Sequence, residues 1–184
     1  MPREWLPYKM VIGMTPREQQ EYKALRATIR ERGTARVWIF ALGITAWAAL
    51  TIATAALSAP PVSTLVPLLT LAASFEAVFA LHIGVERIGR YLQVFFDDEW
   101  EKTSMAFGRP AGAATVDALF VVPFLLAALL NVMPALLAGP TAPELIFIGG
   151  AHALFALRLL VARHVASRQR TVDLDRVQEI RKGH

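Results

Sequence analysis

The sequence predicts an all-α membrane protein in which four transmembrane helices form one bundle, with short amphipathic helices on its cytoplasmic side. Hydrophobic residues make up 55% of the 184 positions, and the mean hydropathy is +0.43. Four stretches are each long enough to cross a hydrocarbon core of ~30 Å as a helix. Lys and Arg are absent from the two connectors at residues 58–61 and 139–144, as expected of outer loops.

The chain begins with residues 1–36, a segment that the charge pattern places in the cytoplasm. A helix is predicted at about residues 16–32. Thr15 and Glu18 have the spacing of a capping box at its start, and Gly33 is a typical C-terminal stop. Its apolar residues share one stripe, so this helix is expected to be amphipathic.

The four spans are predicted at about residues 37–57, 62–85, 114–138 and 144–164. The second span is expected to continue into the cytoplasm as the same helix to about residue 101, because apolar residues recur there at helical spacing. Residues 165–184 are expected to form a cytoplasmic tail. The acidic run Asp97-Asp98-Glu99 is expected to be a solvated face, because three consecutive side chains of a helix point in three directions.

The basic residues give the orientation of the bundle. All 19 Lys and Arg fall into three groups, with eight in residues 1–36, four in 86–109 and seven in 158–184. Short loops rich in Lys and Arg stay inside, so both termini and the middle loop are predicted to be cytoplasmic. The same bias explains the net charge of +4 without a nucleic-acid partner. The composition favours a bacterial inner membrane.

The most informative residues are Glu76 in the second span and Arg158 in the fourth. Counting from the outer ends of their spans places both at nearly equal depth, and each is costly in lipid unless paired. They are therefore predicted to meet in the interior of the bundle. Three roles are open for the pair: a structural ion pair, movement of ions or protons, and docking of a partner's transmembrane helix.

A second polar layer is predicted closer to the cytoplasm. His82, Asp117 and Arg163 come from different spans at similar depth, and Glu86 follows His82 at the i,i+4 spacing. Because the second span presents polar groups to at least two neighbours, it is expected at the centre of the bundle. These residues, together with Glu76 and Arg158, form the predicted intramembrane polar site.

Cofactor binding is a weaker hypothesis. His82 and His164 lie on different spans at comparable depth, which is how haem is held in some four-helix bundles, but His164 sits among arginines at the boundary. His82 and Glu86 have metal-ligand spacing on one helix face, without the further ligands of a known metal motif. No cofactor or metal is therefore predicted, and the absence of cysteine excludes thiol chemistry.

No catalytic motif occurs in the sequence, so an enzyme is not predicted. The leading hypothesis is a non-enzymatic membrane subunit or scaffold that assembles with a larger complex or with itself, through its spans or its cytoplasmic helices. One alternative is a small transporter or proton-conducting unit that uses Glu76, His82 and Asp117 as a relay. A further alternative is a haem- or quinone-linked redox subunit. The expected partners are the lipid bilayer and another protein chain.

Overall fold

The structure is a computed structural model that describes residues 14–107 and 116–183. Helices account for 91% of these residues and no strand occurs among them, which confirms the all-α class. In chain order the elements are α2 (Pro16–Ala56), the 3-10 turn η1 (Pro61–Thr64), α3 (Leu65–Phe95), α4 (Glu99–Phe107), α5 (Val116–Leu137) and α6 (Ala142–Lys182).

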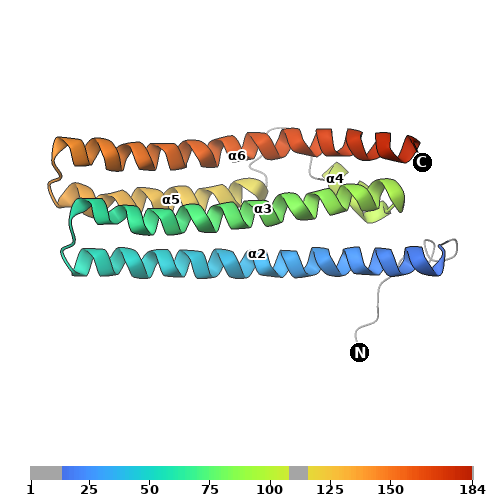
Figure 1. The fold of residues 1–184 in the computed structure, drawn as a ribbon, viewed down its shortest axis with the longest axis horizontal. Helices are drawn as coiled ribbons and strands as arrows, with labels where there is room; N and C mark the ends of the chain where they lie inside the picture. The colour runs from blue at the N-terminus through green and yellow to red at the C-terminus, as the bar shows by residue number, and fades with distance from the viewer. Residues whose placement is uncertain (1–13, 108–115, 184) are drawn as a thin grey trace, which may run out of the picture.

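The helices form one elongated bundle (Figure 1). α3 packs between α2 and α6, and the shorter α5 packs against α6 and α3 along one half of the rod. The connections from α2 to η1 and from α5 to α6 lie at one end. α2 begins and α6 ends at the opposite end, beside α4.

Three helical stretches are long and apolar enough to cross a membrane: Pro16–Ala56, Pro61–Phe95 and Ala142–Lys182. The apolar stretch in α5 is shorter, Val121–Leu137. These lengths indicate an integral membrane protein. The half of the rod that contains the two tight connections also exposes many large apolar side chains, which soluble monomers rarely do; they include Leu42, Ile52, Leu57, Leu69, Leu129, Leu137, Ile146 and Leu154.

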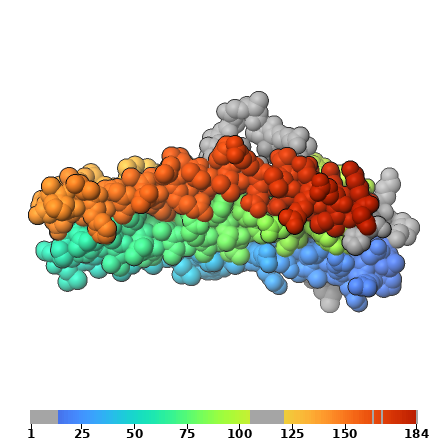
Figure 2. Space-filling view, turned by 45° about the horizontal axis from the view of Figure 1, so that its top comes forward, coloured from blue at the N-terminus to red at the C-terminus, as the bar shows by residue number. Residues whose placement is uncertain are grey.

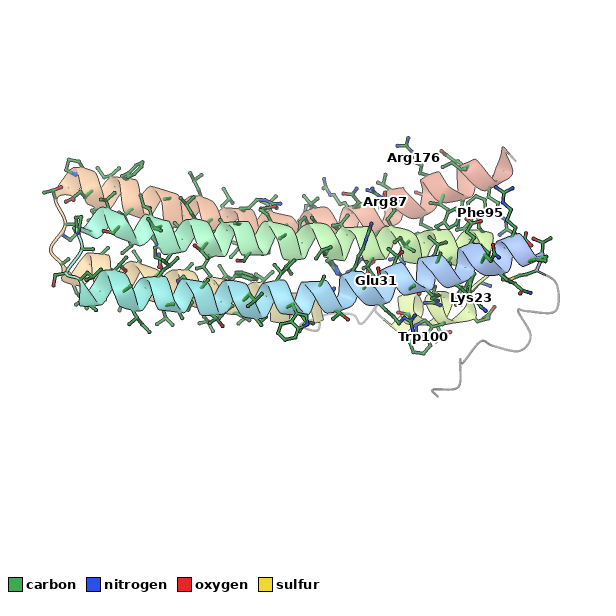
Figure 3. The ribbon with its side chains drawn as sticks, turned by 60° about the horizontal axis from the view of Figure 1, so that its bottom comes forward. Lys23, Glu31, Arg87, Phe95, Trp100 and Arg176 are labelled. Atoms are coloured by element: carbon green, nitrogen blue, oxygen red, sulfur yellow. The ribbon has the colours of Figure 1, made fainter. Side chains whose placement is uncertain are left out.

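Charged side chains gather at the other half of the rod. Figure 3 shows Lys23, Glu31, Arg87 and Arg176 there, together with Trp100 on α4. α2, α3 and α6 therefore each have one apolar half and one polar half along their length. The amphipathic helix predicted at about residues 16–32 is part of α2, and the predicted tail is part of α6.

The core of the apolar half is built from aromatic side chains of three helices. The Phe75 ring lies 5.4 Å from that of Phe124 and 6.3 Å from that of Phe155, both edge-to-face, a favourable geometry for such rings. α2 joins this core through a close approach to α3. A Cβ on Gly43 would lie 2.2 Å from Ser74 Oγ, so a glycine is required where these two helices meet.

The predicted end of the first helix at Gly33 is wrong, because α2 is one helix from Pro16 to Ala56. The capping box at its start is as predicted, with both the Thr15 and Glu18 hydrogen bonds present. A glycine in a helix costs only ~1 kcal/mol relative to alanine. Helical packing on both sides of Gly33, with Tyr22 buried against α3 and the apolar half following, outweighs that cost.

The predicted continuation of the second helix to residue 101 is also wrong. α3 ends at Phe95, and Asp97 adopts a left-handed conformation with φ 53°. A new helix, α4, begins at Glu99 and is capped by the side chain of Asp98. The chain turns here because Asp and Asn tolerate positive φ and because a carboxylate satisfies the free N–H groups of a helix start.

The predicted tail, residues 165–184, is helical as far as Lys182 and continues the fourth span within α6. It packs along α3, where Arg87 Nε lies 3.5 Å from Asp173 Oδ2 and Arg181 donates to the carbonyl oxygen of Val94. The third predicted span, about residues 114–138, corresponds to α5, of which Val116–Leu137 is described.

Candidate functional site

Glu76 on α3 and Arg158 on α6 are in direct contact. Arg158 Nη2 donates to Glu76 Oε2 at 2.7 Å, the length of a strong charge-assisted hydrogen bond. The guanidinium also lies over the rings of Phe75 and Phe79, at 5.8 and 5.2 Å from their centroids. Such cation–π contacts add to the ion pair. Arg158 is thus held against α3 by three neighbouring side chains.

The pair lies on the outer face of the bundle, not in the interior as the sequence analysis expected. Glu76 keeps 49% of its side-chain surface exposed and Arg158 keeps 38%. The adjacent residues Phe75 and Leu159 are buried and fill the interior at this level. Successive residues of a helix point about 100° apart, so Glu76 and Arg158 face outwards.

The exposed surface around the pair is apolar. Ala73 and Ala80 lie one turn away on α3, and Leu154 and Leu157 lie nearby on α6, all of them exposed. By the helical rise, Glu76 lies about 9 Å further along α3 than His82 towards the tight connections. The charges therefore lie within the apolar half of the rod and not at its polar end.

His82 contacts α2. Arg36 Nη1 lies 3.0 Å from His82 Nδ1, so this ring nitrogen accepts the hydrogen bond. The side chains of Asp117 and Arg163, the other members of the predicted lower layer, lie outside the described residues. The described contact of Glu76 is with α6, and that of His82 is with α2.

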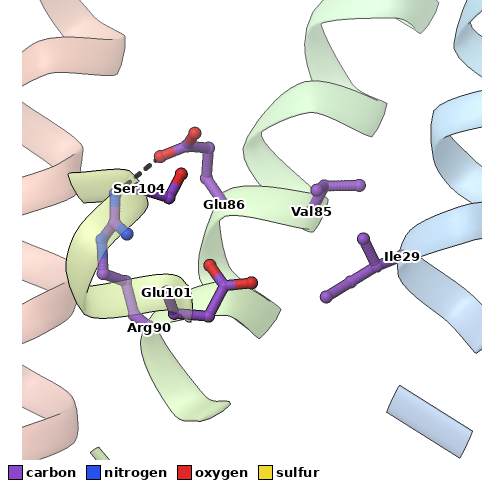
Figure 4. A pocket seen from close by; sticks show the side chains of 6 residues that line it. All are labelled: Ile29, Val85, Glu86, Arg90, Glu101 and Ser104. Atoms are coloured by element: carbon purple, nitrogen blue, oxygen red, sulfur yellow. Dashed lines mark hydrogen bonds and ion pairs between the residues drawn. The ribbon is translucent and has the colours of Figure 1, made fainter. Parts of the chain in front are cut away.

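Glu86 lies nearer the polar end and is shared by two arginines. Its Oε2 is 2.7 Å from Arg90 Nη2 and 3.2 Å from Arg170 Nε. Arg90 is buried, and burial lowers its pKa, as does the neighbouring charge of Arg170, while Glu86 opposes the shift. Figure 4 shows Glu86 and Arg90 in the wall of a cavity of about 220 Å³ between α2, α3 and α4; the other lining residues are Ile29, Val85, Glu101 and Ser104.

The two residues considered as haem ligands lie on different helices. His82 on α3 contacts Arg36, and the side chain of His164 on α6 is exposed. Within residues 14–107 and 116–183, no group of three or more His, Cys, Asp or Glu side chains is arranged to hold a metal ion.

A fully buried amide in α5 forms a polar cluster that the sequence analysis missed. Asn131 has 0% of its surface exposed. Its Oδ1 accepts from Trp47 Nε1 at 3.2 Å and lies 3.3 Å from Thr51 Oγ1, both on α2. Its Nδ2 donates to the Thr64 carbonyl oxygen of η1 at 2.8 Å and lies 3.1 Å from His152 Nε2 on α6. We call these five residues the Asn131 network.

The tautomer of His152 follows from its other contact. His152 Nδ1 lies 2.8 Å from the carbonyl oxygen of Ile148, so it carries the proton and Nε2 accepts from Asn131. Both N–H groups of the amide are then used, and its oxygen accepts from Trp47. The network joins α2, η1, α5 and α6, which makes it a structural link between all the apolar segments except α3.

A second missed cluster lies at the polar end and centres on Asp98, which is 1% exposed. Tyr22 Oη donates to Asp98 Oδ2 at 2.9 Å, and Arg26 pairs with both Asp98 and Glu101. Asp98 Oδ1 accepts the backbone N–H of Trp100 at 3.0 Å. Burial raises the pKa of Tyr22, and the hydrogen bond from Arg26 opposes that shift.

The expectation of a solvated acidic run is therefore wrong for Asp98. The expectation is confirmed for the two flanking residues, because the Asp97 and Glu99 side chains are 73% and 78% exposed. Lys102 bridges these two, at 2.6 Å from Asp97 and 3.0 Å from Glu99. Asp98 follows the turn after Phe95, and its buried carboxylate accepts the first N–H groups of α4.

Comparison with known proteins assigns no function to these clusters. No family model matches the chain, and neither does any curated protein or solved structure.

Proposed function

We propose that this chain is a non-enzymatic membrane subunit that assembles with other membrane-spanning helices through the outer face of α3 and α6. In this proposal four helices cross a bacterial inner membrane, and both termini are cytoplasmic. The 22 residues of α5 extend about 33 Å at 1.5 Å per residue, which is long enough for the third span as well. The distribution of Lys and Arg supports the orientation.

The observation that carries the proposal is the exposure of Glu76 and Arg158 on an apolar face. An arginine in the middle of a lipid-facing helix costs roughly 2.5–3.5 kcal/mol on insertion scales. Pairing with Glu76 reduces that cost, but two half-exposed charges still lose their water without gaining full hydrogen bonding. A partner that covers the pair removes this penalty.

The neighbouring residues suit close contact with another helix. Ala73 and Ala80 flank Glu76 on α3, and small side chains let helix backbones approach in a membrane. Leu154 and Leu157 supply apolar area on α6. A surface of this kind has charges at the centre and apolar or small residues around them.

The relay of Glu76, His82 and Asp117 has less support. Glu76 contacts α6, whereas His82 contacts Arg36 of α2. A proton relay needs its members within hydrogen-bond reach, directly or through one water. The assembly hypothesis needs only the exposed face that α3 and α6 present.

A photo-reactive amino acid in place of Ala73 tests the proposal in native membranes. We expect ultraviolet light to produce a cross-linked adduct at this position. The matched control is the same amino acid in place of Ile52, an exposed residue of α2 on another part of the bundle. An absence of adducts at Ala73, or equal yields at both positions, would contradict assembly through this face.

A further inference from the structure

We infer that the occupant of this face is a second copy of the same chain, in a twofold dimer where Glu76 of each copy contacts Arg158 of the other. This inference rests on the proposed function, because it names the partner for the same surface. It follows from the relative positions of the two charges and from their unused hydrogen-bonding groups.

The two charges lie side by side at one depth. Their side-chain atoms are 2.7 Å apart, and α3 and α6 run in the same direction along the rod (Figures 1 and 2). A twofold axis along the membrane normal keeps every residue at its own depth. It places the α3 side of one copy against the α6 side of the other. Glu76 on the α3 side of one copy therefore comes opposite Arg158 on the α6 side of the other.

Both groups have hydrogen-bonding capacity left. A guanidinium has five N–H donors and a carboxylate accepts at two oxygens. Within the described part of the chain, the pair forms one hydrogen bond, from Nη2 of Arg158 to Oε2 of Glu76. In lipid the other N–H groups have no water to bond. A second Glu76–Arg158 pair supplies acceptors for those donors and donors for the second carboxylate oxygen.

A second copy fits this surface without further assumptions. The two faces together carry two positive and two negative charges, so the assembled site is neutral. An unrelated partner would need a basic side chain opposite Glu76 and an acidic side chain opposite Arg158, both at the same depth in the membrane. In a closed twofold dimer the same patch meets itself, and a neutral pair of opposite charges is self-complementary.

Charge reversal in one member at a time tests the inference. The Glu76→Arg chain carries two positive charges at the face, and the Arg158→Glu chain carries two negative charges. Copies with two different tags are co-expressed and purified through one tag in a mild detergent. Each variant should co-purify with itself about tenfold less than the natural chain does, and the mixture of the two variants should restore co-purification.

A second measurement leaves the charges unchanged, in case the variants fail to fold. The chain has no cysteine, so Ala73→Cys and Leu154→Cys can be introduced in separate, differently tagged copies. A short thiol cross-linker should join the two copies in membranes, whereas Ile52→Cys should not join with Leu154→Cys. Co-purification that is unaffected by charge reversal, or an absence of covalent dimers, overturns the inference.

The two proposals fail in different ways. An Ala73 photo-adduct that contains another protein, without covalent dimers, overturns the second-copy inference and leaves the membrane subunit standing. An absence of both products overturns both.

Discussion

Replacing Asn131 by leucine is expected to lower the free energy of unfolding by about 3 kcal/mol, because one buried and two partly buried polar groups lose their partner. The change keeps the side-chain volume similar but removes one acceptor and two donors. An apolar side chain then faces Trp47 Nε1, the Thr64 carbonyl oxygen and His152 Nε2 in place of the amide. Stranding such a group costs ~1–3 kcal/mol, and contacts between membrane helices lie at the low end of that range.

Reversible unfolding by SDS in mixed micelles, followed by circular dichroism, measures this loss. The matched control is Met133→Leu, two residues further along α5 and half exposed, for which a change below about 0.5 kcal/mol is expected. If Asn131→Leu is as mild as the control, the network does not hold the apolar segments together.

Replacing Asp98 by asparagine is expected to cost about 2 kcal/mol, concentrated at the polar end of the rod. The oxygen of asparagine can still cap α4. The substitution removes the negative charge that faces Arg26, and it replaces the oxygen that accepts the Tyr22 hydroxyl with an NH2 group. Glu101 remains as a partner of Arg26 at 2.8 Å, which limits the loss. We expect amide hydrogens of α4 and of the first turns of α2 to exchange faster, while those of α5 do not change.

Asp97→Asn is the control for this prediction. The residue is adjacent and receives the same chemical change, its side chain is exposed, and asparagine tolerates its positive φ. Its pairing with Lys102 is a surface ion pair, which contributes little to stability. Equal hydrogen exchange in the two variants would show that burial of Asp98 has no energetic consequence.

The all-α class and the lengths of the apolar helical segments were predictable from the sequence. Hydropathy identifies the apolar segments, and the helical rise per residue converts their residue numbers into lengths. The contact between Glu76 and Arg158 followed from counting depth along two helices that run the same way. Its outward orientation did not follow, because counting gives height along a helix and not direction around it. That direction is set by Phe75 and Leu159, whose burial depends on how all four helices pack.

The two missed clusters had different causes. Asn131 and His152 are polar residues in apolar spans, and depth counting from the outer end places them within about 5 Å of one level. Nothing in the sequence around Asp98 indicated in a similar way that its side chain would be buried. Its burial depends on the turn at Asp97, and a run of three acids at the end of a helix gives no sign of which one caps the next helix.

Single-cysteine labelling of intact cells with a membrane-impermeant maleimide tests the central claim, that four helices span the membrane with the polar end inside. Ala59→Cys and Ala138→Cys lie in the two tight connections, and Ser104→Cys lies on α4 at the other end. The proposed topology predicts that the first two react in intact cells and that the third reacts only after permeabilisation. Labelling of Ala59→Cys and Ala138→Cys from opposite sides, or of Ser104→Cys in intact cells, would contradict it.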